Sequence, residues 1–418
     1  MMIGKAVAAL CLAAAVPSAF ATEWQDVGPR AMGMGGVGVA LPDNGPLSSY
    51  WNPGSLGRYD NPSGFEIPVG AQATVDGDLI QVANNLNQIY QDCNSTPQGP
   101  LCTQSNITNA LDELANKSNG LRADANGGLD MKFGKLALFA DNLSYAGMSL
   151  NHIDTTDTQT SLASPDAFTN NNSSVTVTGL AATEFGLGYG HEIPFIPGLS
   201  VGGNIKAIVG ETAYQLVNVV TQGSNGFSHL QTVQSIRPGV DLGALWDLSR
   251  MGLPLHPMAG ITARNINDPK FAMSQEAQAN GMSTLSYQGT TRAGVSLRPF
   301  HWWFVEADAD LTRNLTLDGT ESQMLALGTE VNIFNRPGLN IPLRAGVSKN
   351  MADGLTSVSL GAGLDLLHVH IDAAATASPQ SQDIQSVGKT TTIPTSLGGQ
   401  VQVGVLFGGS GKDKQAAQ

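Results

Sequence analysis

The stretch GFEIPVGAQATV, residues 64–75, alternates along its length between apolar side chains and polar or small ones. Successive side chains of a β-strand point to opposite faces, so a period of two predicts a strand with two unlike faces. The apolar set is Phe65, Ile67, Val69, Ala71, Ala73 and Val75, and the other set is Glu66, Pro68, Gly70, Gln72 and Thr74.

The same alternation returns through the rest of the chain, for example in EFGLGYG (184–190), GVDLGALWDL (239–248) and QVQVGVLF (400–407). We count about fourteen such strands of roughly seven to thirteen residues, many of them joined by short turns of Gly, Pro or Asn. In the strands whose phase is clear, the apolar face carries no charge. The opposite face holds Glu184, Lys206, Asp241, Asp247, Arg264, Arg298, Glu306, Asp308, Asp310, Glu330, Arg344 and Asp372.

Two architectures sort charges in this way. A soluble β-sandwich buries the apolar face, whereas a transmembrane barrel turns that face to lipid and encloses the polar one. A Lys or Arg that faces lipid at mid-depth costs about 2–4 kcal/mol, so a bilayer selects for a charge-free face. An open twisted sheet rarely holds so many strands in one series, and no linker divides residues 64–407. We therefore predict an all-β fold, a transmembrane antiparallel β-barrel of about 14 strands.

The N-terminus supports this choice. Residues 1–21 have the features of a signal peptide: Lys5, an apolar run from Ala6 to Val16, and an Ala19-Phe20-Ala21 cleavage site. Two observations count against a barrel, namely an aromatic content of only 6% and the eleven residues that follow Phe407. We expect residues 408–418 to be a disordered tail. Candidates for interfacial girdles stand near strand ends: Tyr189, Trp246, Trp302 and Trp303.

Composition excludes some functions. The net charge of −13 and the lack of a basic run argue against nucleic-acid binding, which needs clustered Lys and Arg. His368, His370 and Asp372 follow one another at spacings of two, which can present ligands to a metal, but a polar ladder lining the lumen explains them more simply. With no G-x-S-x-G or HExxH motif, we predict no enzyme, no metal and no cofactor.

The insert at residues 76–120 has helical rather than strand periodicity. Its apolar stripes are Leu79, Ile80, Ala83, Leu86 and Tyr90, and then Ile107, Ala110, Leu111 and Leu114. In an oxidising compartment Cys93 and Cys102 favour a disulfide over a metal site. We predict two short helices joined by this bond as a lid over the extracellular mouth. The stripes either catch an apolar ligand or pack on one another.

Gly33, Gly35 and Gly38 form a G-x-G-x-x-G pattern within RAMGMGGVGVA, residues 30–40. A dinucleotide fingerprint needs a buried strand before the glycines and a helix after them, and here Pro29 and Pro42 stand in those places. We predict instead that residues 22–63 form a compact plug inside the polar lumen, or else an ordinary lead-in to the first strand. The plug residues are Gly33, Gly35, Gly36, Gly38, Trp51, Asn52, Pro53 and Gly54.

PRAMGMGGVGVALPDNGPLSSYWNPGSL, residues 29–56, resembles the N-terminal hatch of FadL-like outer-membrane transporters, and more closely that of their TraF-like and PorV-type relatives. GITARNINDP and VEADADLTRN also resemble that group. The resemblance implies a Gram-negative outer-membrane barrel of fourteen strands, closed by a hatch, that takes up hydrophobic small molecules such as long-chain fatty acids. The alternative is a barrel that docks partner proteins of conjugation or secretion.

In FadL-like proteins the ligand leaves sideways through a kinked strand near the hatch. The candidate kink in this sequence lies in KLALFADNLSYAGM, residues 135–148, at Asp141, Asn142 and Gly147. These residues could equally mark the point where the strand leaves the membrane.

Overall fold

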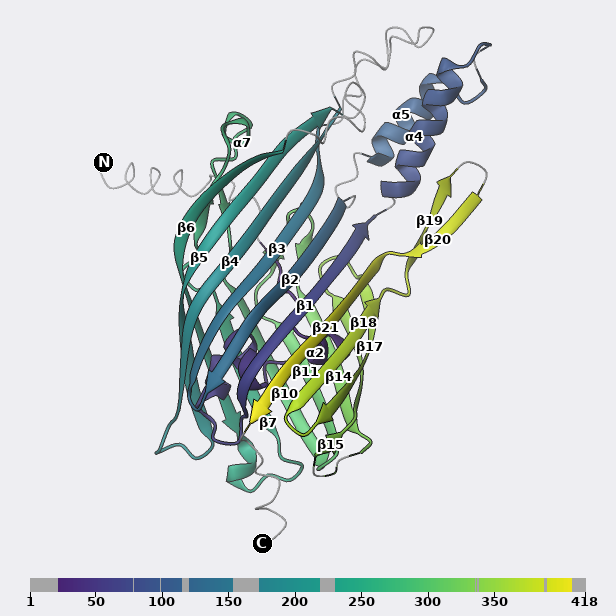
Figure 1. The fold of residues 1–418 in the computed structure, drawn as a ribbon. Helices are drawn as coiled ribbons and strands as arrows, with labels where there is room; N and C mark the ends of the chain where they lie inside the picture. Colours follow the sequence, from purple (N-terminus) through teal and green to yellow (C-terminus); the bar gives the residue numbers. More distant parts are fainter. Residues whose placement is uncertain are drawn as a thin grey trace, which may run out of the picture.

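The computed structural model describes residues 22–77, 79–97, 99–114, 120–152, 173–218, 230–334, 336, 338–386 and 389–407. The predicted signal peptide and C-terminal tail lie outside these residues. Within them, one antiparallel sheet closes on itself through the β17–β18 pairing. Fourteen described strands form this barrel, which confirms the predicted fold class (Figure 1). None of the described helices has the length and apolar character needed to cross a bilayer.

The barrel strands follow one another around the wall in chain order. They are β1 (Ser63–Asp76), β2 (Gly120–Phe133), β3 (Leu136–His152), β4 (Ser174–Glu192), β5 (Leu199–Asn218), β6 (Gln231–Asp247), β7 (Met258–Arg264), β10 (Thr290–Phe300), β11 (Trp303–Asp310), β14 (Met324–Asn332), β16 (Pro342–Asn350), β17 (Thr356–Leu366), β18 (Val369–Ala377) and β21 (Ser396–Phe407). The wall is uneven in height, because β4 and β5 have 19 and 20 residues whereas β14 and β16 have nine each.

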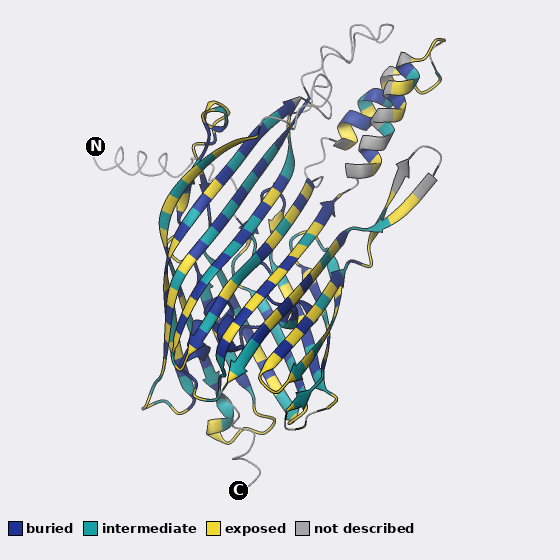
Figure 2. Cartoon of the chain, viewed as in Figure 1, coloured by how far each residue is buried: buried dark blue, intermediate teal, exposed yellow. Residues whose placement is uncertain are grey.

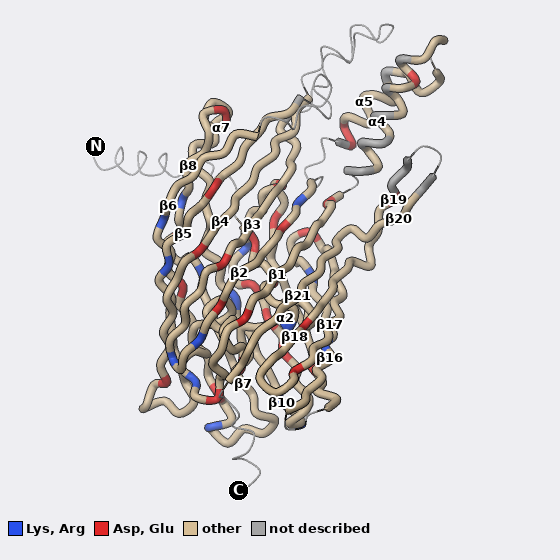
Figure 3. Tube along the Cα trace, viewed as in Figure 1, with Lys and Arg blue, Asp and Glu red and all other residues tan. Residues whose placement is uncertain are grey.

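The two faces of the wall differ as the alternation predicts (Figure 2). Outward side chains such as Phe185, Ile205 and Leu360 are 53%, 65% and 66% exposed, whereas the inward Glu184 and Asp308 are 1% exposed. Figure 3 shows charged residues along the barrel strands, and the burial of those on the inward face directs them into the lumen. So many large exposed apolar side chains on one surface require hydrocarbon around them, so the barrel spans a membrane.

Small elements connect the strands at the end where the loops are long. The insert forms α4 (Leu79–Asn94) and α5 (Gln104–Leu114), which lie beside the hairpin of β19 (Ser381–Ser386) and β20 (Lys389–Pro394). The loop between β7 and β10 folds into β8 (Lys270–Ala272), α7 (Gln275–Ala279) and β9 (Thr284–Ser286). At this end β12 (Asn314–Leu315) also pairs with β13 (Glu321–Ser322), whereas β15 (Leu339–Asn340) pairs with β17 at the end with the short turns (Figure 1).

Candidate functional site

Residues 22–62, which we name the N-terminal segment, lie inside the barrel and are packed against its wall. The segment contains α2 (Pro29–Gly33), η1 (Gly45–Leu47), α3 (Ser48–Trp51) and η2 (Pro53–Gly57). Met34, Val39 and Leu56 are fully buried. Wall glycines make room for the segment, because a Cβ at Gly328 or Gly346 would collide with the backbone at Met34.

The glycines of the G-x-G-x-x-G pattern allow close packing in the lumen. Gly35 and Gly36 have φ angles of +78° and +88°, a region that favours glycine. A Cβ on Gly38 would lie 2.5 Å from the Trp51 ring, and one on Gly33 would lie 3.0 Å from the Cα of Gly361 in β17. The helix α2 ends at Gly33, the first of these glycines, so a helix and not a strand leads into the pattern, and the arrangement is not that of a dinucleotide-binding loop.

The Asn52 side chain forms hydrogen bonds to two other residues of the segment and to one residue of the barrel wall. Its Nδ2 donates to the Val39 carbonyl at 2.7 Å and to the Ala244 carbonyl of β6 at 3.0 Å. Its Oδ1 accepts from the Gly54 amide at 2.9 Å and so caps η2. The Asn-Pro-Gly turn is therefore positioned by hydrogen bonds to β6 as well as by its own backbone.

Wall carboxylates bind the backbone of the segment. Asp308 Oδ2 accepts from the amides of Gly38 and Val39 at 2.8 and 3.1 Å, and Glu306 Oε1 accepts from the Ala40 amide at 2.6 Å. Both carboxylates come from β11, where they stand two residues apart on the inward face. They therefore give three successive amides the partners that a buried backbone requires.

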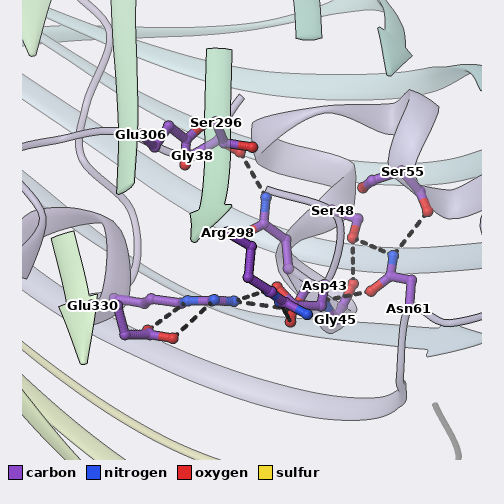
Figure 4. A network of polar contacts seen from close by, with 12 residues as sticks. Gly38, Asp43, Gly45, Ser48, Ser55, Asn61, Ser296, Arg298, Glu306 and Glu330 are labelled. Carbon is purple, nitrogen blue, oxygen red and sulfur yellow. Dashed lines mark hydrogen bonds and ion pairs between the residues drawn. The ribbon is translucent and has the colours of Figure 1, made fainter. Parts of the chain in front are cut away.

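A second contact is an ion-pair network around Arg30. Its guanidinium lies 2.9 Å from Glu330 of β14 and 3.0 Å from Asp43. Arg344 of β16 lies 2.8 Å from the same Glu330 carboxylate, and Arg298 lies 3.4 Å from Asp43. Figure 4 shows Glu330, Arg298 and Asp43 grouped in this network. Charge on the inner wall thus holds the segment at several points.

Aromatic rings of the segment pack on buried arginines of the wall. Trp24 and Tyr50 meet edge to face with centroids 5.9 Å apart. Arg264 of β7 lies 3.8 Å from the Tyr50 centroid, and Arg292 of β10 lies 4.9 Å from that of Trp24. Burial raises the pKa of the nearby Asp26 carboxyl to about 6, although Arg292 opposes the shift.

A small void of about 10 Å³, enough for about one water molecule, remains beside these rings. Aromatic side chains of Trp24, Tyr50, Tyr145 and Tyr287 line it, together with Arg264. Its wall also contains buried polar atoms that have no hydrogen-bond partner among the described residues, namely Thr22 Oγ1, Trp24 Nε1, Arg264 Nε and Asn265 Oδ1. The void therefore has a mixed lining of aromatic rings and polar groups, some of which have no hydrogen-bond partner.

Comparison with known proteins assigns the chain to a family. A family model described as "F plasmid transfer operon, TraF, protein" matches residues 49–310, which is more than half of the 418 residues. The chain belongs to the TraF family. A comparison with curated proteins finds no match.

Solved structures resemble this TraF-family chain in fold. The CymD monoaromatic hydrocarbon channel is 14% identical with a TM-score of 0.51, covering 93% of this chain and 99% of that one. A Pseudomonas aeruginosa FadL homologue has the same four values. The Pseudomonas putida toluene transporter TodX is 13% identical with a TM-score of 0.50, covering 93% of this chain and 100% of its own. The predicted FadL-like barrel fold is confirmed.

The predicted disulfide of this TraF-family chain is confirmed. Cys93 and Cys102 are bonded, with their Cα atoms 4.9 Å apart. Around the bond, Ile89 of α4 packs on Ile107 and Leu111 of α5. Ile107, Ala110 and Leu111 of the predicted α5 stripe therefore pack on α4. The side chains of the predicted α4 stripe lie outside the described residues, so the choice between the two alternatives is not tested. Figure 1 shows the pair projecting beyond the barrel beside β19 and β20, so its role as a lid stays a prediction.

The three candidate kink residues all lie within β3, but on different faces. Asp141 and Gly147 are buried on the inward face, and Asn142 faces outward, where its Nδ2 donates to Thr183 Oγ1 at 2.9 Å. The β3 ladders with β2 and β4 run through these residues without a register shift, which occurs only at Leu150 and His152. An opening at this point stays a prediction.

The predicted His-His-Asp ladder is only partly present. His370 and Asp372 face the lumen from β18, where His370 Nε2 lies 3.2 Å from Glu66 and Asp372 pairs with Arg344. His368 is exposed in the turn before β18, because β17 and β18 reverse direction there. In the described part of the chain, no group of three or more His, Cys, Asp or Glu side chains could hold a metal ion.

Sequence reasoning missed the contribution of the loop between β7 and β10 to the packing inside the barrel. Phe271 and Leu285 of this loop are fully buried, in one apolar cluster with Tyr50 of the segment and Ile208 and Leu180 of the wall. Thr212 of β5 donates to the Ala272 carbonyl at 2.7 Å. Apolar residues spaced through an otherwise polar loop were the available signal.

Proposed function

We propose that this chain is a Gram-negative outer-membrane barrel for the passive uptake of hydrophobic small molecules, such as long-chain fatty acids or hydrocarbons, and that it is not an enzyme. The observation that carries the proposal is the filled lumen. One apolar cluster runs from the loop between β7 and β10 to the N-terminal segment, inside a wall whose outer face is apolar. The names of the similar structures, a hydrocarbon channel and a toluene transporter, support the ligand class.

In this proposal the N-terminal segment is the hatch. Its contacts with Asp308, Glu306 and Glu330 are polar, so an apolar ligand gains nothing by breaking them. The ligand instead follows the apolar cluster toward the rings of Trp24 and Tyr50.

We place the sideways exit between β1 and β2. Their ladder holds one register but has no pair between Glu66↔Asp130 and Val69↔Gly127. Pro68 lies in this gap and has no N–H to donate. The gap is next to the candidate kink, because Gly127 and Gly128 pair on their other side with Asn142 and Asp141 of β3. Weak pairing here lets the wall open with little loss of hydrogen bonding.

The test joins the two strands covalently. Ile67→Cys with Leu129→Cys places a disulfide across the gap, and Ala71→Cys with Ala125→Cys places one across a regular pair of the same two strands. We expect cells that take up a labelled fatty acid through this protein to lose uptake with the first bond and to keep it with the second. Reduction should restore it. Equal uptake with both bonds would exclude this exit.

The second candidate is a barrel that docks partner proteins, and the description of the TraF family favours it. The disulfide-bonded helices and the β19–β20 hairpin, which project beyond the wall, would be the docking surface. Purified protein that carries no lipid and retains no fatty-acid probe, yet captures a conjugation or secretion protein through this surface, would support docking over uptake.

A further inference from the structure

The barrel end with the short turns exposes large apolar side chains at the turn tips. Phe195 is 82% exposed, Leu367 78%, Met251 61% and Phe334 49%. These residues come from four different connections, β4–β5, η5 (Leu248–Met251) after β6, β14–β16 and β17–β18. Short turns of such barrels face the periplasm. Exposure of so many apolar side chains to water is unfavourable, so we expect another molecule to cover these turn tips.

Outward tryptophans show where the membrane boundary lies. Trp303 Nε1 donates to Thr329 Oγ1 at 2.8 Å, and Trp302 stacks on Phe300 with centroids 5.3 Å apart. Trp246 Nε1 donates to the Pro197 carbonyl of the β4–β5 turn at 3.2 Å. Tryptophan gathers at the interface of lipid head groups and acyl chains, so the apolar tips lie at this interface.

Basic side chains lie at the same end of the barrel, although the chain as a whole has a net charge of −13. Lys135 follows β2, Arg250 lies in η5, and Arg336 lies between β14 and β16. The Arg250 side chain is 45% exposed, and its ion pair with Asp247 is a long one of 3.8 Å. Arg336 is exposed and pairs with no carboxylate among the described residues. These cations are available to an external anion.

We infer that this turn end is a binding surface for anionic phospholipid head groups of the periplasmic leaflet. The apolar tips enter the upper acyl region, and Lys135, Arg250 and Arg336 contact the phosphates. A protein partner could cover apolar tips alone. The combination of apolar tips, exposed cations and outward tryptophans at one level matches the layers of an anionic lipid interface.

The test uses full-length protein in phosphatidylcholine vesicles in which about a quarter of the lipid is brominated phosphatidylglycerol or brominated phosphatidylcholine. Bromine quenches tryptophan only at contact, and Trp246, Trp302 and Trp303 stand at the proposed surface. We expect phosphatidylglycerol to be preferred about threefold at low salt, and the preference to disappear near 1 M salt, where charge is screened within about 3 Å.

Two variants separate the turn end from general charge effects. Lys135→Gln, Arg250→Gln and Arg336→Gln together should reduce the preference to parity. Lys270→Gln, Arg313→Gln and Lys349→Gln remove three exposed cations at the opposite end and should leave it unchanged. Heat-modifiable gel mobility checks that each variant is folded. Parity in the wild type, a preference that survives high salt, or equal loss in both variants would overturn the inference.

Discussion

The N-terminal segment and the helical insert flank β1 on its two sides in the chain, and they are stabilised in opposite ways. The segment lies in the lumen, where Asp308, Glu306 and Glu330 of distant strands bind its backbone and its arginine. The insert builds a core of its own from α4 and α5, and a disulfide of sequence separation 9 closes it. The segment therefore depends on barrel closure, whereas the insert depends on a local cross-link.

The two regions therefore differ in how closely their positions depend on the barrel wall. Any shift of the segment must break contacts with β11, β14 and β16, so its position is coupled to the wall. The main contacts of the insert among the described elements are those of α4 with β1 and with β19. Variants in the two regions should accordingly differ in how far their effects spread.

The largest expected effect comes from Trp51→Ala in the segment. Trp51 is 1% exposed, and its Nε1 donates to the Val27 carbonyl at 2.8 Å. Loss of such a buried aromatic costs about 3–5 kcal/mol. We expect the free energy of unfolding, measured by denaturant titration in detergent, to fall by this amount. Trp302→Ala on the outer face is the control, and an equal fall there would contradict the comparison.

A smaller effect is expected from Cys93→Ser with Cys102→Ser, a double variant that lacks the disulfide of the insert. Removing so short a loop closure costs about 2–3 kcal/mol. Because the insert has its own core, the loss should appear as faster hydrogen exchange in α4 and α5. Exchange in the N-terminal segment should not change. Faster exchange in both regions would mean that the insert also supports the lumen.

Asp308→Ala removes a contact between the segment and the barrel wall by changing a residue of the wall. The amides of Gly38 and Val39 lose their acceptor, at a cost of about 1–3 kcal/mol. Hydrogen exchange at these two amides should become faster, while α4 and α5 stay protected. Glu321→Ala removes an exposed carboxylate that pairs with Arg313 and serves as the control.

The smallest expected effect is a pH dependence through Asp26. Burial raises its pKa to about 6 from an ordinary value of 3.8, so the packed segment binds a proton more tightly than the unfolded chain does. The packing of the segment is therefore most stable below about pH 4, and this stability is lost as the pH rises from about 4 through 6. Asp26→Asn should stabilise the protein by about 1–3 kcal/mol at pH 8 and by nothing at pH 4. Thermal unfolding of both proteins across this range measures it.

Much of the wall was predictable because the alternation of side chains within each strand indicates which face meets lipid. The alternation around Phe65 and Glu66 gives the orientation of β1 without knowledge of its neighbours. The disulfide and the helical insert were also local features. The binding of Gly38 and Ala40 by Asp308 and Glu306 was not predictable, because those partners are more than 250 residues apart in the chain.

The sequence by itself determined the strand pattern, the sorting of charge to one face, and the glycines that a confined segment needs. Only the tertiary structure decided which wall residues hold that segment, how the loop between β7 and β10 folds inward, and where the β1–β2 ladder is weak. The physical reason is range: side-chain alternation is set by the backbone of one strand, whereas ion pairs and packing in the lumen exist only after fourteen strands have closed.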